Sequence, residues 1–182
     1  MKIYTGISSR ETPGEILSLF KKLATYLAKQ SYVLRSGGAK GADIAFETGC
    51  DKANGKKEIY VPWRNFEGSN STLIVSNNQS TKPYTIAQQF HPYWHNLSQG
   101  ARKLQARNTH QILGYDLDNP VFSNFVICWT KSGRGQGGTG QAIRIAKHYN
   151  IPVFDAGGWS DMEEIKFRLR EFLSNKTERS ED

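Results

Sequence analysis

The sequence contains little that is typical of a secreted or membrane protein. It has two cysteines in 182 residues. Cys50 and Cys128 both stand in apolar segments, so we expect reduced core residues and no disulfide. No apolar run approaches the length of a membrane-spanning helix. The opening residues MKIYTGISSR lack the apolar core of a signal peptide. We therefore expect a cytoplasmic protein with no membrane partner.

The sequence also lacks a compact basic cluster. Its 24 Lys and Arg residues outnumber its 17 Asp and Glu residues, which gives a formal net charge of +7. This balance favours an anionic partner. Because the basic residues are scattered along the chain, a small phosphorylated ligand suits them as well as a nucleic acid does.

Patterns that would bind a metal are scarce too. His91 and His95 are spaced four residues apart, as two ligands on one helical face would be. No third ligand stands at a suitable spacing, and Pro92 disturbs the helix. We predict no metal site and no cofactor. His110 is expected on the surface of a helix.

Strand and helix patterns alternate along the chain, with no repeat or linker that divides it. Strand patterns occupy residues 2–6, 32–35, 57–61, 125–129 and 151–155. This alternation predicts an α/β, Rossmann-like domain of three layers with a mostly parallel five-stranded sheet. Numbered along the chain, its strands should follow the order 3-2-1-4-5. We expect the domain to cover 1–175, with an irregular and helical insertion at 62–97 and a flexible tail at 176–182.

Glycine-rich loops follow three of these strands: GISSR (6–10), SGGAKGAD (36–43) and KSGRGQGGTGQ (131–141). In a parallel sheet they lie at one edge, where glycine lets a ligand approach the backbone and helix N-termini favour anions. The third loop matches G-x-G-x-x-G twice, and Asp155 stands where a ribose-binding acid would. A nicotinamide fingerprint usually opens its domain, whereas this loop follows the fourth strand. We therefore favour a cradle for another phosphate.

The stretch LRSGGAKGADIAFE, the ARN at 106–108 and GGTGQA after an apolar strand resemble the SLOG superfamily. This superfamily includes DprA/Smf, the YpsA/YspA-like proteins and the LOG-type phosphoribohydrolases, and the resemblance covers almost the whole chain. It implies a Rossmann-like fold, a nucleotide-derived ligand and a homo-oligomer. The loops and the resemblance together give these candidate ligand-binding residues: Gly6, Ser8, Ser9, Arg10, Ser36, Gly37, Gly38, Lys40, Asp43, Arg107, Asn108, Thr130, Gly137, Gly138, Thr139 and Gln141.

The resemblance favours ligand binding without turnover. LOG enzymes carry a catalytic glutamate in PGGxGTxxE, and alignment of Gly138 and Thr139 with its GT places Ala142 at the glutamate position. We therefore name no catalytic residue. The expected ligand is a signalling nucleotide, such as a cyclic oligonucleotide or an ADP-ribose derivative, sensed or sequestered in conflict between phage and bacteria.

Two other functions stay open. A LOG-like hydrolase that cleaves the N-glycosidic bond of a nucleotide would need another acid, for which Asp43, Glu47 and Asp116 are the nearby choices. Asp43 could instead stabilise the dipole of its helix. DprA-like binding of single-stranded DNA would use the basic charge and base stacking on Trp63, Tyr93 or Trp94.

Overall fold

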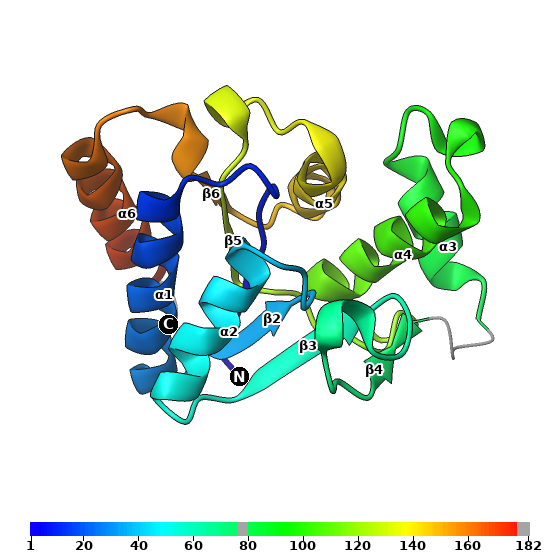
Figure 1. Cartoon of the computed structure of the whole chain (residues 1–182), viewed down its shortest axis with the longest axis horizontal. Coiled ribbons are helices and arrows are strands. Elements are labelled where there is room, and N and C mark those ends of the chain that lie inside the picture. Colours follow the sequence, from blue (N-terminus) through cyan, green and yellow to red (C-terminus); the bar gives the residue numbers. More distant parts are fainter. Residues whose placement is uncertain (76–79, 178–182) are drawn as a thin grey trace.

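The computed structural model describes residues 1–75 and 80–177, and within them it shows one parallel sheet of six strands (Figure 1). The strands are β1 (Ile3–Gly6), β2 (Val33–Ser36), β3 (Lys57–Val61), β4 (Leu73–Ile74), β5 (Phe125–Cys128) and β6 (Val153–Asp155). Their order is β4-β3-β2-β1-β5-β6, and every neighbouring pair is parallel. The predicted α/β fold is confirmed, and the five predicted strands follow the predicted order.

The prediction of five strands is wrong by one, because β4 adds a strand at the edge of the sheet. It lies in the insertion, where Leu73 and Ile74 pair with Tyr60 and Val61 of β3. The hydroxyl of Ser71 donates to the backbone oxygen of Ile59 and holds this segment against β3. A strand of two residues carries no alternation, so its sequence gives no periodic signal.

Helices cover both faces of the sheet. The longer helices are α1 (Gly14–Lys29), α2 (Ala42–Lys52), α3 (Lys82–Gln89), α4 (Gln99–Leu113), α5 (Gly137–His148) and α6 (Met162–Thr177). Short 3-10 turns are η1 (Phe66–Gly68), η3 (Trp94–Asn96), η4 (Lys131–Gly133) and η5 (Ala156–Gly158). One face packs against α1, α2 and α6, and the other against α4 and α5, while α3 lies on the outer side of α4 (Figure 1).

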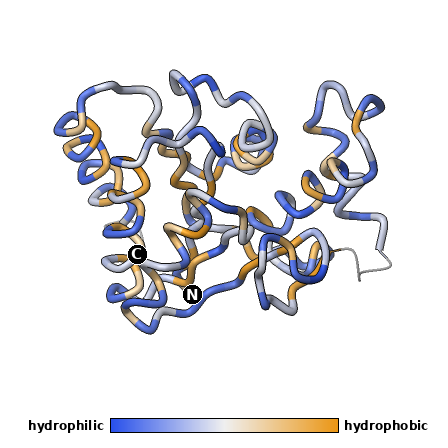
Figure 2. The backbone as a smooth tube through the Cα atoms, in the orientation of Figure 1, coloured by the Kyte–Doolittle hydropathy of each residue, from blue (hydrophilic) through white to orange (hydrophobic). Residues whose placement is uncertain are grey.

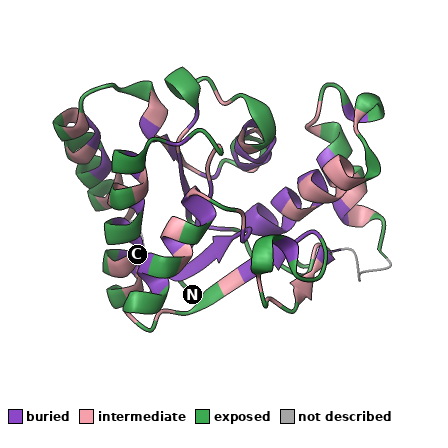
Figure 3. Cartoon of the chain, viewed as in Figure 1, coloured by how far each residue is buried: buried purple, intermediate pink, exposed green. Residues whose placement is uncertain are grey.

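Alternating side chains of β5 divide the apolar core between these two faces. Phe125 and Ile127 join the cluster under α1, α2 and α6, whereas Val126 and Cys128 join the cluster under α4 and α5. All four are fully buried, and apolar and buried residues gather along the strands (Figures 2 and 3). This explains why the strand is apolar at every position. Both cysteines are buried and unpaired, as expected.

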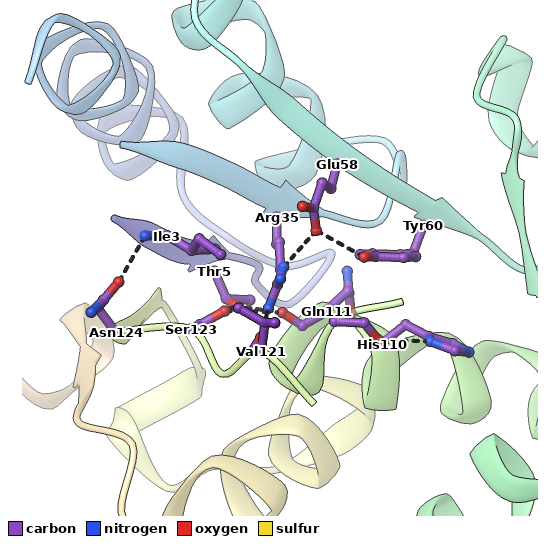
Figure 4. A network of polar contacts seen from close by, with 11 residues as sticks. Ile3, Thr5, Arg35, Glu58, Tyr60, His110, Gln111, Val121, Ser123 and Asn124 are labelled. Atoms are coloured by element: carbon purple, nitrogen blue, oxygen red, sulfur yellow. Dashed lines mark hydrogen bonds and ion pairs between the residues drawn. The ribbon is translucent and has the colours of Figure 1, made fainter. Parts of the chain in front are cut away.

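A buried polar network fixes the end of α4 against the sheet (Figure 4). Arg35 of β2 is 2% exposed, and its Nε donates to Glu58 Oε2 on β3 at 2.6 Å. The hydroxyl of Thr5 on β1 donates to the backbone oxygen of Gln111 at 2.6 Å. The prediction that His110 lies on the surface is wrong: it is 2% exposed, and its ring stacks on Tyr60 with centroids 5.5 Å apart. The contacts of Gln111 and His110 hold the end of α4 against β1 and β3, and the Arg35–Glu58 pair joins β2 to β3.

The insertion and the tail are partly described. The insertion contains η1 and β4 before residue 75, and α3 and η3 after residue 80. The helix α3 of the insertion begins at Lys82, with Pro83 in its first turn. Of the predicted tail, Lys176 and Thr177 belong to α6, and 178–182 lie outside the described residues.

Candidate functional site

A cleft of about 390 Å³ opens at the carboxyl edge of the sheet, beside β1 and β5. The chain leaves β1 toward β2 on one side and returns to β5 on the other, so the order of the sheet reverses here. Ligands of open α/β sheets bind at such a switch point. The lining residues are Ile7, Ser8, Ser9, Arg10, Ala39, Asp43, Phe66, Leu104, Gln105, Arg107, Asn108, Gln111, Gln136, Gly137, Gly138 and Thr139.

The cleft brings together candidates from all three glycine-rich loops and from α4. The candidates that line it are Ser8, Ser9, Arg10, Asp43, Arg107, Asn108, Gly137, Gly138 and Thr139. The remaining candidates, which are absent from its lining, are Gly6, Ser36, Gly37, Gly38, Lys40, Thr130 and Gln141. Four of the remaining candidates, Ser36, Gly37, Gly38 and Lys40, belong to the SGGAKGAD loop, whereas most candidates of the other motifs line the cleft.

Two of these remaining residues have clear structural roles: Ser36 bonds to the neighbouring strand, and Gly6 leaves space for a packed aromatic ring. The Ser36 hydroxyl donates to the backbone oxygen of Gly6 at 2.6 Å, which ties the ends of β1 and β2 together. A Cβ on Gly6 would lie 2.6 Å from the ring of Phe46, so only glycine fits there. Gly38 adopts a φ of +67°, which favours glycine. Lys40 is exposed, and its ammonium lies 3.7 Å from the carboxylate of Glu67.

The glycine loop before α5 leaves the first turn of that helix open to the cleft. Gln136 is the N-cap residue, and its side chain makes no capping hydrogen bond. A Cβ on Gly140 would lie 1.9 Å from the backbone oxygen of Gly135, so glycine is required where the loop meets the helix. Gly137, Gly138 and Thr139 line the cleft with the N–H end of the helix. Such an end attracts anions.

Thr130 and Asp155 hold this loop in place through hydrogen bonds. The backbone N–H and the hydroxyl of Thr130 both donate to the carboxylate of Asp155, and the N–H of Gly135 donates to Thr130 Oγ1 at 2.9 Å. Asp155 also accepts from the N–H of Gly157 at 3.0 Å. This carboxylate is engaged in holding two loops together, and it does not belong to the cleft lining.

Arg107 and Asp43 place opposite charges in the buried part of the cleft. Arg107 Nη1 donates to the backbone oxygen of Gly37 at 3.0 Å, and its guanidinium lies 5.6 Å from the ring centre of Phe66. Asp43 is 4% exposed, and its Oδ2 accepts from the N–H of Ala39 at 3.2 Å.

Burial is the largest influence on the pKa values of Asp43 and Arg107. It raises the pKa of Asp43 from the ordinary 3.8 to about 6, although the positive charge of Arg107 opposes this shift. Burial also lowers the pKa of Arg107, which Asp43 opposes and the charge of Arg10 reinforces. Arg10 is exposed, and its side chain has no ion pair or hydrogen bond within the described residues. Two cations and one carboxyl of raised pKa therefore share the cleft, which favours an anionic ligand.

Asn108 joins the helices that form the walls. Its Nδ2 donates to the backbone oxygen of Gly138 at 3.0 Å and to Gln141 Oε1 at 3.0 Å. The amide of Gln141 in turn donates to the backbone oxygen of Ala87 at 3.2 Å. These bonds link α4, α5 and α3, so the side chain of Gln141 positions the cleft without lining it.

Hydroxyl groups near β1 are also largely engaged. Ser8 Oγ donates to the backbone oxygen of Trp129 at 2.7 Å and accepts from its N–H at 2.9 Å. Ser9 Oγ accepts from the N–H of Glu11 at 3.2 Å, which leaves its own hydrogen available. Ser9 is therefore the better placed of the two to bind a ligand.

Sequence reasoning missed several lining residues, namely Ile7, Ala39, Phe66, Leu104, Gln105, Gln111 and Gln136. Leu104, Gln105 and Gln111 share a face of α4 with Arg107 and Asn108, at steps of three and four residues. Helical periodicity around the ARN motif would have found them. No comparable pattern points to Phe66, which enters from η1 in the insertion.

The residues named for the alternative functions lie elsewhere, apart from Asp43. Glu47 lies 3.2 Å from the ammonium of Lys57, Asp116 is exposed, and neither lines the cleft. Ala142 is fully buried in the core under α5. Among the aromatic residues considered for base stacking, Trp94 is 7% exposed, whereas Trp63 and Tyr93 are 37% and 69% exposed, and the cleft lining includes none of them.

Comparisons with protein-family models, with curated proteins and with solved structures found no match to this chain. Throughout 1–75 and 80–177, every helix is too short or too polar to cross a membrane. Within the same residues, His91 and His95 belong to no group of three or more His, Cys, Asp or Glu side chains that could hold a metal ion.

Proposed function

We propose that this protein binds a nucleotide-derived, phosphate-containing ligand in the cleft beside β1 and β5 and does not convert it. The carrying observation is the convergence of Arg10, Arg107 and the open N-terminus of α5 on one cleft at the switch point of the sheet. In this proposal the phosphates lie against Gly137, Gly138 and Thr139. Arg10, whose side chain is exposed and has no partner within the described residues, would then close on the same phosphates.

The resemblance to the SLOG superfamily supports a nucleotide as the ligand. It extends the proposal to a signalling nucleotide, sensed or sequestered in conflict between phage and bacteria, and to a homo-oligomeric protein. The absence of a glutamate at Ala142, and the burial of that position in the core, support binding without turnover.

Mass spectrometry of small molecules released from the heat-denatured protein tests this proposal first. Calorimetric titration with ADP-ribose and with cyclic di- and trinucleotides tests it next, and we expect at least one of them to bind. The variant Arg10→Ala should weaken binding by about tenfold to a hundredfold, the value of one charge-assisted hydrogen bond. Arg170→Ala, which removes an exposed arginine from α6, is the matched control. A folded protein that retains no nucleotide and binds none of these ligands would contradict the proposal.

The state of Asp43 favours a second candidate function, hydrolysis of an N-glycosidic bond. It is the carboxyl group among the described residues that lines the cleft, and burial raises its pKa to about 6, which suits proton transfer near neutral pH. Water would attack C1′ of the ribose as the bond to the base breaks, and Asp43 would donate its proton to the leaving base. The attacking water would release one proton, which restores the proton on Asp43. Release of free base from nucleoside monophosphates, lost in Asp43→Asn, would establish this activity. No release by the folded wild-type protein would reject it.

A further inference from the structure

Three buried polar atoms in the floor of the cleft lack hydrogen-bond partners among the described residues. They are Oε1 and Nε2 of Gln111 and Nε of Arg107. Gln111 is fully buried, yet it belongs to the lining of the cleft, as does Arg107. Buried amide groups in folded proteins nearly always have partners, so an unpaired one at a binding cleft calls for a functional explanation.

Neighbouring residues hold Gln111 in place. Its backbone oxygen accepts from the hydroxyl of Thr5 at 2.6 Å, at the end of the polar network in Figure 4. A Cβ on Gly37 would lie 2.4 Å from Gln111 Nε2 and 2.8 Å from Arg107 Cζ. The glycine therefore provides the space in which both side chains converge. Asn108, on the same helix, donates the hydrogen bonds to α5, whereas the side chain of Gln111 lines the cleft.

The chemistry of these atoms limits what they can bind. A carboxamide presents a donor group and an acceptor group side by side. The Nε–H of Arg107, which has no partner among the described residues, adds a second donor group. The other two nitrogens of this guanidinium, Nη1 and Nη2, donate to Gly37 and Asn108. A phosphate oxygen can accept from the two donors, but it cannot donate to Gln111 Oε1. The conclusion is the same if the side-chain amide of Gln111 is rotated by 180°, because neither its nitrogen nor its oxygen has a partner among the described residues.

We infer that Gln111, together with Arg107 Nε, recognises a non-phosphate part of the ligand that presents a hydrogen-bond donor and an acceptor side by side. This inference rests on the proposed function. Two parts of a nucleotide have this chemistry: the cis-diol of the ribose and the amide-type edge of the base. Gln111 is thus a specificity-determining residue, whereas the N-terminus of α5 provides general affinity for phosphate.

Calorimetry with matched probes tests this division of roles. The probes are inorganic pyrophosphate, the four ribonucleoside diphosphates and their 2′,3′-dideoxy forms, titrated into the wild-type protein and into Gln111→Met. Methionine fills similar volume without the amide, so the fold should tolerate it. We expect Gln111→Met to weaken binding of the preferred ribonucleoside diphosphate by about tenfold to a hundredfold, the value of two hydrogen bonds, and to leave pyrophosphate binding unchanged. Gln88→Met, on the exposed side of α3, is the control.

The probes also identify the group that is recognised. The recognised group is the diol if removal of the two hydroxyl groups from the ribonucleoside diphosphate weakens its binding to the wild-type protein as much as Gln111→Met does. If the dideoxy forms bind like the parent while Gln111→Met binds weakly, it is the base edge. Should Gln111→Met fail to fold, Gln111→Asn, which withdraws the amide by one methylene, replaces it in the same comparison.

Two results would overturn the inference, and they differ in what they say of the proposed function. Equal binding of the nucleoside diphosphates by wild type and Gln111→Met, with pyrophosphate also bound, removes the role of Gln111 and leaves phosphate binding intact. Binding of no probe at all by the folded wild-type protein removes both.

Discussion

Replacement of Asp43 by asparagine should stabilise the protein at neutral pH. Asp43 is 4% exposed, and burial raises the pKa of its carboxyl from 3.8 to about 6 even though Arg107 opposes the shift. A shift of this size means that the ionised carboxylate costs the folded state about 3 kcal/mol relative to the unfolded chain. The attraction of Arg107 is already contained in this balance.

The cost depends on pH in a defined direction. Between pH 4 and 6 the folded protein keeps a proton on Asp43 that the unfolded chain has begun to lose, so stability falls as the pH rises through this window. Above about pH 6 the full cost is present. Asparagine carries no charge, and its side-chain oxygen can still accept from the N–H of Ala39. We therefore expect Asp43→Asn to be more stable than wild type by about 1–3 kcal/mol at pH 7.5, and by about a third of that at pH 4.5, where the carboxyl of the unfolded chain is already mostly ionised.

Urea denaturation of both proteins at pH 4.5, 5.5, 6.5 and 7.5 measures this difference directly. Asp51→Asn is the control on the same helix, because Asp51 is exposed and pairs with Lys57 at the surface at 2.7 Å. Its effect should be small at every pH. Parallel stability curves for wild type and Asp43→Asn would refute the reasoning. So would a variant that is less stable at pH 7.5, since Arg107 would then hold Asp43 ionised at no net cost.

Three further predictions concern other parts of the molecule. Glu58→Gln should destabilise the fold by about 3–5 kcal/mol, because it leaves the buried Arg35 without its counterion, whereas Glu163→Gln at an exposed pair should cost less than about 1 kcal/mol in the same urea titrations. Gly37→Ala should weaken ligand binding by at least about tenfold in calorimetry, since its Cβ would displace Gln111 and Arg107, whereas Gly100→Ala, with open space around its Cβ, should bind normally. Cys50 and Cys128 should react with a thiol reagent at pH 8 only after unfolding, because both are buried and burial raises the pKa of Cys50 to about 11; rapid reaction of the native protein would contradict this.

The layered fold can be predicted from the sequence because its main strands carry strong local signals. In β5 every residue from Phe125 to Cys128 is apolar, and the structure buries each of them against one of two helical layers. Alternation of strands and helices then determines a parallel sheet, and the long segment between β3 and β5 allows the order to reverse at β1. The edge strand β4 escapes prediction because pairing with β3 creates it, and its own two residues have no period.

The site is predictable where it follows a motif and not where it depends on packing between distant segments. Arg107 belongs to the ARN motif, and the open turn of α5 follows from its glycine loop. Phe66 reaches the cleft from η1, where Asn65 and Glu67 adopt φ values of +59° and +51°. Asparagine often adopts this conformation, but neither residue indicates that Phe66 packs against Arg107, which lies far along the chain on α4. The wrong placement of His110 has the same origin, because its partner Tyr60 lies on a strand fifty residues earlier.

The meaning of the SGG motif changes when the contacts of its missing side chains are considered. A glycine pattern after a strand suggests that the backbone touches a phosphate, and on that basis Gly37 and Gly38 were natural ligand candidates. In the structure, Gly37 provides space for Gln111 and Arg107, and the Cβ of any other residue would collide with them. The motif therefore shapes the cleft by making room for two side chains of α4. A glycine motif that shapes a cleft in this way constrains the polar residues opposite to it, and here those residues carry buried polar atoms with no hydrogen-bond partner among the described residues. In the proposed complex, these atoms bind the ligand.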